Sequence, residues 1–154
     1  MQVVVLGATG NVGVAVVRAL MADPTVERVV GVARRVPDRA VAGARGHPAD
    51  ITTDDLVPVL AGADAVVHLA WLIQPSRSPQ RLWQVNVDGT GRVLDAVAAA
   101  GVPAFVHASS VGAYSPGPRD GAAVDETWPT HGIATSEYSR QKAYVERMLD
   151  AFEA

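Results

Sequence analysis

The segment VVVLGATGNVG, residues 3–13, decides which fold the rest of the chain can adopt. Residues 3–6 form a short apolar run, which predicts a buried strand, and residues 12–21 have the spacing of a helix. Gly7, Gly10 and Gly13 stand between and inside these two elements. We expect Gly7 to permit the tight turn out of the strand and Gly13 to let the helix pack closely on the sheet. Gly10 would let another molecule approach the backbone.

A strand, a glycine-rich turn and a helix in this order are typical of a site for the pyrophosphate of a dinucleotide. The first turn of the helix offers free N–H groups and the positive end of the helix dipole, and both attract phosphate. The predicted binding residues are Gly7, Thr9, Gly10, Asn11, Val12 and Gly13. A glycine-rich turn without a ligand is the alternative, but the position of this turn at the start of an alternating chain favours a nucleotide.

Apolar runs and helical patterns alternate along the remaining chain. Strands are predicted at residues 29–33, 45–49, 65–70 and 104–108. Helices are predicted at 54–60 with Thr53 as N-cap, from 79 to about 100, and from 136 to the end. Strands this apolar are buried on both faces. The fold class is therefore α/β, a doubly wound parallel sheet or Rossmann fold, with loops at 71–78 and 111–137.

The composition excludes several classes of function. The chain has 154 residues, enough for one domain, and its net charge of −3 predicts no binding to nucleic acid or membranes. No apolar run reaches the roughly 18 residues of a membrane span, and no signal peptide is evident, so we expect a cytoplasmic protein. There is no cysteine and the four histidines fit no metal-site spacing, so no metal is predicted. We interpret His68 and His107 as strand residues with hydrogen-bond partners.

The end of the second predicted strand bears on which dinucleotide binds. Sites for NAD usually carry an acidic residue there that accepts a ribose 2′-hydroxyl. Here the strand ends in Ala33, Arg34 and Arg35, and the first acid, Asp38, follows Pro37. A guanidinium can bind a 2′-phosphate through two N–H groups, so the sequence favours NADP, with Arg34 as the binding residue. Two ordinary surface arginines are the alternative, which leaves NAD open.

Tyr138 and Lys142 form the most distinctive pair in the chain. Lys142 is its single lysine, since the other basic residues among the 13 lysines and arginines are all arginine. Four residues apart on a predicted helix, the two side chains share a face. A fixed ammonium favours the phenolate, so the tyrosine can exchange a proton with an alcohol or carbonyl. An ammonium with three donors can also bind two ribose hydroxyls. An incidental pair on an amphipathic helix is the alternative.

Together these motifs resemble the short-chain dehydrogenase/reductase superfamily, and more closely its extended branch, the NAD(P)-dependent epimerase/dehydratase family. The resemblance rests on GATGNVG (7–13) and YSRQK (138–142), with HLA (68–70), NVDGTGRVLDA (86–96) and HASSVGAY (107–114) between them in the family's order. It implies that five further residues belong to the cofactor site: Asp50, Ile51, Leu69, Ala70 and Asn86. Asn86 would act by supporting the lysine, and packing between helix and sheet is its alternative role.

The resemblance also implies a reaction. Tyr138 would be the acid/base, Lys142 would bind the nicotinamide ribose, and Ser110 would donate a hydrogen bond to the reacting oxygen. The implied enzyme is an NAD(P)-dependent epimerase, dehydratase or reductase. It would transfer hydride to or from a small carbonyl or hydroxyl compound, a class that includes nucleotide sugars. A dinucleotide-binding module without catalysis, or an inactive fragment of a longer enzyme, is the alternative.

The chain departs from the family's pattern after the last predicted helix. Members of the extended branch continue there with more strands and a C-terminal substrate domain, so we interpret residues 1–154 as the dinucleotide-binding domain, with a sheet incomplete at its C-terminal side. The last helix has one apolar face, formed by Val145, Met148, Leu149 and Phe152. We expect this face to need a cover, such as a second copy in a homodimer. Three residues are predicted at the mouth of the site: Trp71, Gln74 and Tyr114.

Overall fold

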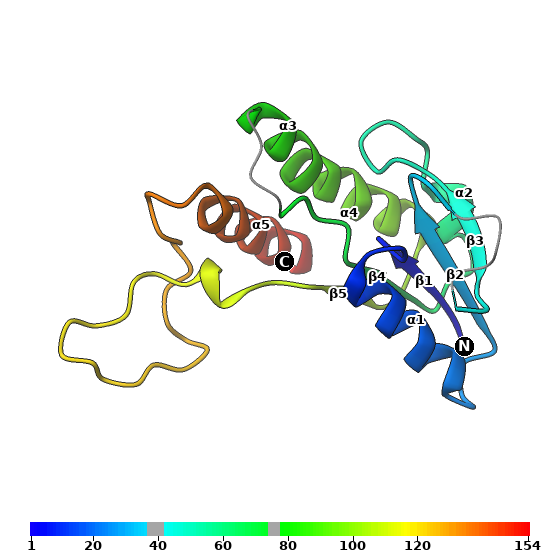
Figure 1. The fold of residues 1–154 in the computed structure, drawn as a ribbon, viewed down its shortest axis with the longest axis horizontal. Helices are drawn as coiled ribbons and strands as arrows, with labels where there is room; N and C mark the ends of the chain where they lie inside the picture. The colour runs from blue at the N-terminus through cyan, green and yellow to red at the C-terminus, as the bar shows by residue number, and fades with distance from the viewer. Residues whose placement is uncertain (37–41, 74–77) are drawn as a thin grey trace.

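The structure is a computed structural model that describes residues 1–36, 42–73 and 78–154. A parallel five-stranded sheet with helices on both faces forms its centre, which confirms the predicted Rossmann fold (Figure 1). The strand order is β3-β2-β1-β4-β5. The strands are β1 (Gln2–Leu6), β2 (Arg28–Ala33), β3 (Arg45–Pro48), β4 (Ala65–His68) and β5 (Phe105–His107). The winding reverses between β1 and β4, and in such sheets ligands bind at the carboxyl ends of the strands at that point.

The register of the three central strands brings their carboxyl ends level. Leu6 pairs with Val32 on one side and with His68 on the other. The chain therefore leaves β1, β2 and β4 at one edge of the sheet, and the residues that follow these strands converge there.

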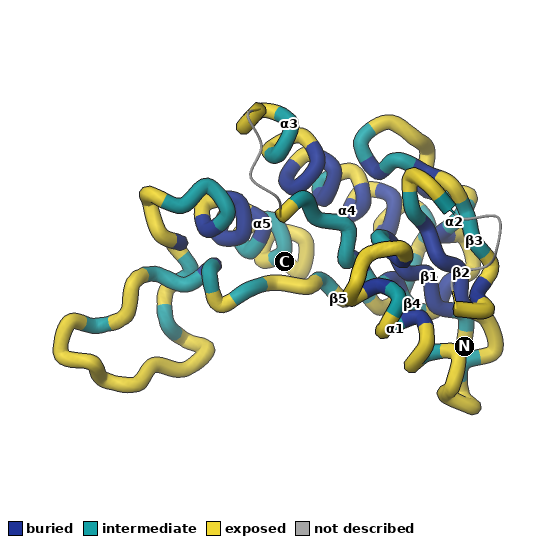
Figure 2. Tube along the Cα trace, viewed as in Figure 1, coloured by how far each residue is buried: buried dark blue, intermediate teal, exposed yellow. Residues whose placement is uncertain are grey.

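The two faces of the sheet are covered by different helices. On one face, α1 (Asn11–Ala22) places the fully buried Val17 over Val3 and Val5. On the other face, α2 (Val57–Leu60) and α4 (Gly89–Ala100) pack on Val4, Leu6 and Val66. Figure 2 shows the burial concentrated in the sheet and on the inner sides of these helices. Within the described ranges, no helix has both the length and the apolar character needed to cross a membrane.

The long helix predicted from residue 79 is interrupted by a π-helical turn. The chain forms α3 (Pro79–Trp83), the π-helical turn Gln84–Asp88, and then α4. Ser78 caps the first of these, because its side chain accepts a hydrogen bond from the backbone N–H of Arg81. The wider turn buries Val85, Asn86 and Val87 together. Such turns occur often at functional sites, and hydrophobic spacing does not reveal them.

Two predicted element boundaries differ from the structure by more than one residue. Helix α2 begins at Val57, and the expected cap, Thr53, lies outside it. Asp54 and Asp55 instead accept hydrogen bonds from the backbone N–H groups of Asp50 and Val57, which holds this stretch in turns. Strand β4 ends at His68, so residues 69 and 70 belong to the loop at the carboxyl edge.

Helix α5 (Glu137–Glu153) lies beside α4 and the π-helical turn. Its apolar face is mostly covered by this chain: Val145 is fully buried, and Met148 is half-buried, with its Cε methyl against Gly91 of α4. The ring of Phe152 is 39% exposed and meets Phe105 at a centroid distance of 6.5 Å. The expectation that this face lacks a cover is therefore wrong for most of its length. A homodimer stays a prediction and needs another surface.

The long loop before α5 is closed at its base. The backbone N–H of Ser115 donates to the carbonyl of Pro129 at 2.7 Å, and Trp128 Nε1 donates back to the carbonyl of Ser115 at 3.2 Å. The backbone N–H of Gly132 donates to the carbonyl of Ala113. Residues 116–127 project from the body of the domain as an extended loop (Figure 1).

Candidate active site

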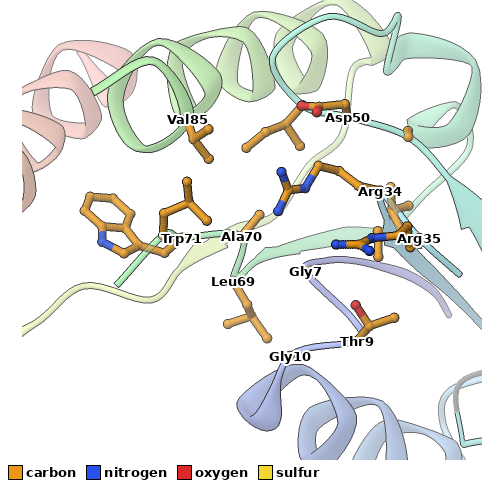
Figure 3. A pocket seen from close by; sticks show the side chains of 15 residues that line it. Gly7, Thr9, Gly10, Arg34, Arg35, Asp50, Leu69, Ala70, Trp71 and Val85 are labelled. Carbon is orange, nitrogen blue, oxygen red and sulfur yellow. The ribbon is translucent and has the colours of Figure 1, made fainter. Parts of the chain in front are cut away.

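A cavity of about 270 Å³ opens at the carboxyl edge of the sheet, where the winding reverses. The residues that line it come from the turn after β1, the ends of β2 and β3 and the loop after β4 (Figure 3). Eight of the sequence-predicted site residues are among them: Gly7, Thr9, Gly10, Arg34, Asp50, Ile51, Leu69 and Ala70. The glycine turn, the end of β2 and the segments after β3 and β4 thus converge on one cavity.

The three glycines of the first turn differ in what surrounds them. Gly7 has a φ of +86°, and a Cβ there would stand 2.7 Å from the backbone nitrogen of Ala70. A Cβ on Gly13 would overlap the carbonyl oxygen of Gly7, so this glycine lets α1 pack against the turn. A Cβ on Gly10 would meet only the Gly7 oxygen, at 3.3 Å. Any larger side chain there would extend into the space that a ligand backbone or phosphate would use.

The start of α1 suits an anion. Gly10 is the N-cap residue, no side chain caps the helix, and its first turn contains no acidic residue. The first N–H groups of a helix have no partner within it, so those of α1 are available to a phosphate. Asn11 and Val12 lie in this turn and are exposed. The residues present therefore fit the pyrophosphate of a dinucleotide.

Two arginines stand at the β2 end of the cavity. Arg34 and Arg35 both line it, and Figure 3 shows the Arg34 side chain extending into it. Burial alone would raise the pKa of Asp50, but hydrogen bonds from Thr52 and the guanidinium groups of Arg34 and Arg81 outweigh burial and leave this pKa below its ordinary value. Asp50 therefore stays ionised beside Arg34. The sequence analysis did not assign Arg35, and Asp38 lies outside the described residues.

Ser110 and Tyr138 meet on either side of one glycine. Ser110 Oγ accepts a hydrogen bond from the backbone N–H of Gly112 at 3.0 Å, so its own O–H remains able to donate. A Cβ on Gly112 would stand 3.2 Å from Cε1 of Tyr138 and 3.3 Å from Ser110 Oγ. The absence of a side chain at Gly112 is what leaves room for both the serine and the tyrosine beside it. This requirement was not recognised from the sequence.

Lys142 is almost fully buried one helical turn after Tyr138, with an exposed fraction of 3%. Its Nζ donates to the carbonyl of Ala108 at 2.6 Å and lies 3.5 Å from the centroid of a Trp71 ring. Burial lowers the pKa of Lys142 to about 8, and the carboxylate of Glu146 opposes that effect. Glu146 also accepts a hydrogen bond from Ser109 Oγ.

Two histidines lie under this site and are neutral at pH 7. Burial, with the charges of His107 and Lys142, lowers the pKa of His68 to about 3. Burial and Lys142 lower the pKa of His107 to about 4. His68 Nε2 shares a hydrogen bond of 3.0 Å with Thr90 Oγ1. Among the described residues, His68 Nδ1 and both ring nitrogens of His107 have no partner, so the expectation of fully paired strand histidines is only partly met.

Asn86 lies beside α5 and does not line the cavity. Its Oδ1 accepts from the backbone N–H of Leu72 at 2.7 Å, and its Nδ2 donates to the Leu72 carbonyl and to Gln141 Oε1. The residue therefore ties the loop after β4 to α5, next to Lys142, which agrees with a supporting role.

The remaining expectations concern the mouth of the site. Trp71 lines the cavity, Tyr114 does not, and Gln74 lies outside the described residues. The other lining residues were not assigned from the sequence, because most are apolar positions at strand ends that look like ordinary core: Val32, Ala33, Ala49, Leu72 and Val85.

Comparison with known proteins now decides the family. The family model described as "NAD dependent epimerase/dehydratase family" matches residues 3–154. The chain belongs to this family.

Individual members show how far the likeness extends. The chain is 33% identical to sterol demethylase protein B of Methylococcus capsulatus over 95% of this chain and 45% of that protein. It is 38% identical to dTDP-glucose 4,6-dehydratase of Streptomyces antibioticus over 73% of this chain and 33% of that one. The solved structure of MoeE5 in complex with UDP-glucuronic acid and NAD superposes with a TM-score of 0.82 at 30% identity, covering 100% of this chain and 50% of that chain. This chain thus covers half or less of the length of each of these relatives.

Proposed function

We propose that residues 1–154 form the cofactor-binding and proton-transfer part of an NAD(P)-dependent epimerase, dehydratase or reductase. The observation that carries the proposal is the meeting of Ser110 and Tyr138 at Gly112, with Lys142 buried one turn away. A cavity fit for a dinucleotide lies next to this group. The named relatives act on, or are solved with, nucleotide sugars and sterols, so we propose a small hydroxyl or carbonyl substrate of a similar kind. A C-terminal substrate domain in the longer protein is part of this proposal.

Each side chain of the site would have its own role in the reaction. The bound nicotinamide would supply or accept the hydride. Tyr138 would take the proton from a substrate hydroxyl, or return it to a carbonyl oxygen. Lys142 would bind the hydroxyls of the ribose next to the nicotinamide. Ser110 would donate its O–H to the same substrate oxygen, since its lone pair already accepts from Gly112 N–H.

NADP is proposed over NAD on the strength of the arginines. Arg34 and Arg35 give the β2 end of the cavity a positive charge that suits a 2′-phosphate. Asp50, ionised near Arg34, would repel that phosphate in part, but its charge also attracts the Arg34 guanidinium. NAD remains the competing cofactor.

Titration of the protein with NADPH and NADH, followed by tryptophan fluorescence, tests the cofactor. Tighter binding of NADPH is expected, and Arg34→Ala should remove the difference while leaving NADH unaffected. Equal or tighter binding of NADH would reject NADP but not the site. Binding of neither would contradict the dinucleotide site.

Tyr138→Phe separates catalysis from cofactor binding. The variant should bind the cofactor as tightly as wild type but lose turnover with a panel of nucleotide sugars and hydroxysteroids, measured by the absorbance of reduced nicotinamide. Undiminished turnover of Tyr138→Phe would contradict its role. Cofactor binding by a wild-type protein that turns over no member of the panel would favour a non-catalytic binding module.

A further inference from the structure

Trp71 separates the cofactor cavity from the catalytic side chains. Its indole stands at the end of the cavity opposite Arg34 and Arg35 (Figure 3). Lys142 Nζ lies against the same indole, 3.5 Å from a ring centroid. Of the described residues, those that line the cavity include Trp71 but not Ser110, Tyr138 or Lys142. A ligand that extends from the arginines toward Lys142 therefore meets the indole first.

The ammonium of Lys142 is already engaged in this arrangement. One N–H donates to the carbonyl of Ala108, and the charge faces the electron-rich ring of Trp71. The side chain is only 3% exposed. An ammonium has three donors, and a ribose diol would use two of them. Ala108 takes one donor and leaves two, but the indole covers the ammonium, so these two donors are not open to both hydroxyls.

The contacts of the Trp71 indole leave its N–H without a hydrogen-bond partner among the described residues. Its ring makes edge contacts with Tyr138 and His107, each at a centroid distance of 6.1 Å. Its Nε1 is buried and has no hydrogen-bond partner among the described residues. A buried N–H without a partner costs free energy, so a position in which Nε1 reaches water or a ligand oxygen offsets part of the loss of the cation contact.

We propose that Trp71 is a latch on the cofactor site. Its indole rests on Lys142 when no cofactor is bound, and the ribose next to the nicotinamide displaces it. Displacement frees Lys142 and removes the indole from Tyr138, so the cofactor has to bind before the substrate can be aligned. This inference rests on the proposed dinucleotide site.

Two ligands without a nicotinamide ring test the latch. ADP would occupy only the arginine end of the cavity, whereas ADP-ribose carries the second ribose to Lys142. Their 2′-phosphorylated forms replace them if NADPH binds more tightly than NADH. Trp71→Ala should tighten ADP-ribose binding by roughly 3- to 30-fold, the range of a cation–π contact, and leave ADP binding unchanged in isothermal calorimetry. Trp71→Phe should tighten it less.

A matched control is Trp83→Phe, whose ring packs on Tyr144 at 5.0 Å, away from the cavity, and which should change neither affinity. Weaker or unchanged binding of ADP-ribose by Trp71→Ala would overturn the latch, because the indole would then support the ligand or play no part. If thermal unfolding shows that the alanine variant is not folded, the affinity of Trp71→Phe for ADP-ribose decides. Tighter binding than wild type supports the latch, and weaker or unchanged binding overturns it. Failure of wild type to bind either ligand would instead contradict the proposed cofactor site.

Discussion

Asn86 and Gln141 are hydrogen-bonded side chain to side chain at 2.8 Å, although 55 residues separate them in the sequence. Both have an exposed fraction of 1%. The same Asn86 amide makes two hydrogen bonds to the backbone of Leu72, the neighbour of Trp71. Gln141 is the neighbour of Lys142. One buried amide thus fixes the loop that carries Trp71 relative to the helix that carries the lysine.

Asn86→Leu should lower the free energy of unfolding by about 2–4 kcal/mol, because it leaves the backbone groups of Leu72 and the amide of Gln141 buried without their partner. Urea unfolding measures the change. Asp88→Ala, at an exposed position of the same π-helical turn, is the control and should change stability by less than about 0.5 kcal/mol. An equal loss of stability in Asn86→Leu and Asp88→Ala would show that the π-helical turn, and not the hydrogen bonds of the Asn86 amide, accounts for the stability.

The sequence was sufficient for most of the fold. Apart from β3, the strands are mostly apolar runs, the glycine turn identifies the first of them, and alternation with helices implies parallel pairing. The π-helical turn was not predictable, because a shift of one hydrogen bond leaves the spacing of Val85 and Val93 compatible with one helix. The start of α2 was missed because Asp54 and Asp55 bind backbone N–H groups, which is a local competition that periodicity does not record.

The site was predictable where a residue type is itself the signal. Gly7, Arg34 and Lys142 each stand out from their neighbours in the sequence. The importance of Gly112 depends on where Tyr138 lies in space, and the position of Trp71 on Lys142 depends on the path of a loop. Both arise from contacts between segments distant in the chain, so one sequence without the structure cannot reveal them.

Gly112→Ala should reduce turnover by roughly 10- to 100-fold while leaving stability and cofactor affinity nearly unchanged. Its Cβ would press on Tyr138 Cε1 and Ser110 Oγ, and small displacements of reacting groups have effects of this order. Steady-state kinetics with the substrate found by the panel measures it. Gly117→Ala is the matched control, since nothing lies within 4 Å of a Cβ there. Full activity of Gly112→Ala would mean that the serine and the tyrosine need not adjoin.

Acid should destabilise the protein well above the pH at which carboxylates titrate. His68 and His107 have folded pKa values of about 3 and about 4 against an ordinary histidine pKa of 6.5, so the unfolded chain binds their protons first as the pH falls. From pH 7 to pH 5 the loss is about 2 kcal/mol for each histidine. Urea unfolding at the two pH values should show it.

His107→Phe should remove about half of that loss and raise stability at pH 7. The substitution puts an apolar ring in place of one whose two buried nitrogens have no hydrogen-bond partner in the part of the chain that the structure describes. His47→Phe, at a half-buried position of β3 that does not line the cavity, is the control and should leave the acid-induced loss in place. A pH dependence that is identical in wild type and His107→Phe would show that His107 is not neutral in the folded protein.

Lys142 should make the protein more stable as the pH rises from 7 to 10. Its folded pKa of about 8 lies below the ordinary lysine pKa of 10.5, so between these values the unfolded chain holds a proton that the folded protein has released. The free energy of unfolding should therefore rise by about 2–3 kcal/mol over this range. Lys142→Met lacks this increment, and because the chain has no other lysine, the difference between the two proteins isolates it.

The charged lysine at neutral pH is then a group that destabilises the folded protein, as expected of a residue that serves binding and proton transfer. A difference in the free energy of unfolding between wild type and Lys142→Met that stays constant with pH would instead show that Lys142 keeps its proton throughout. Burial would then not lower the pKa of Lys142.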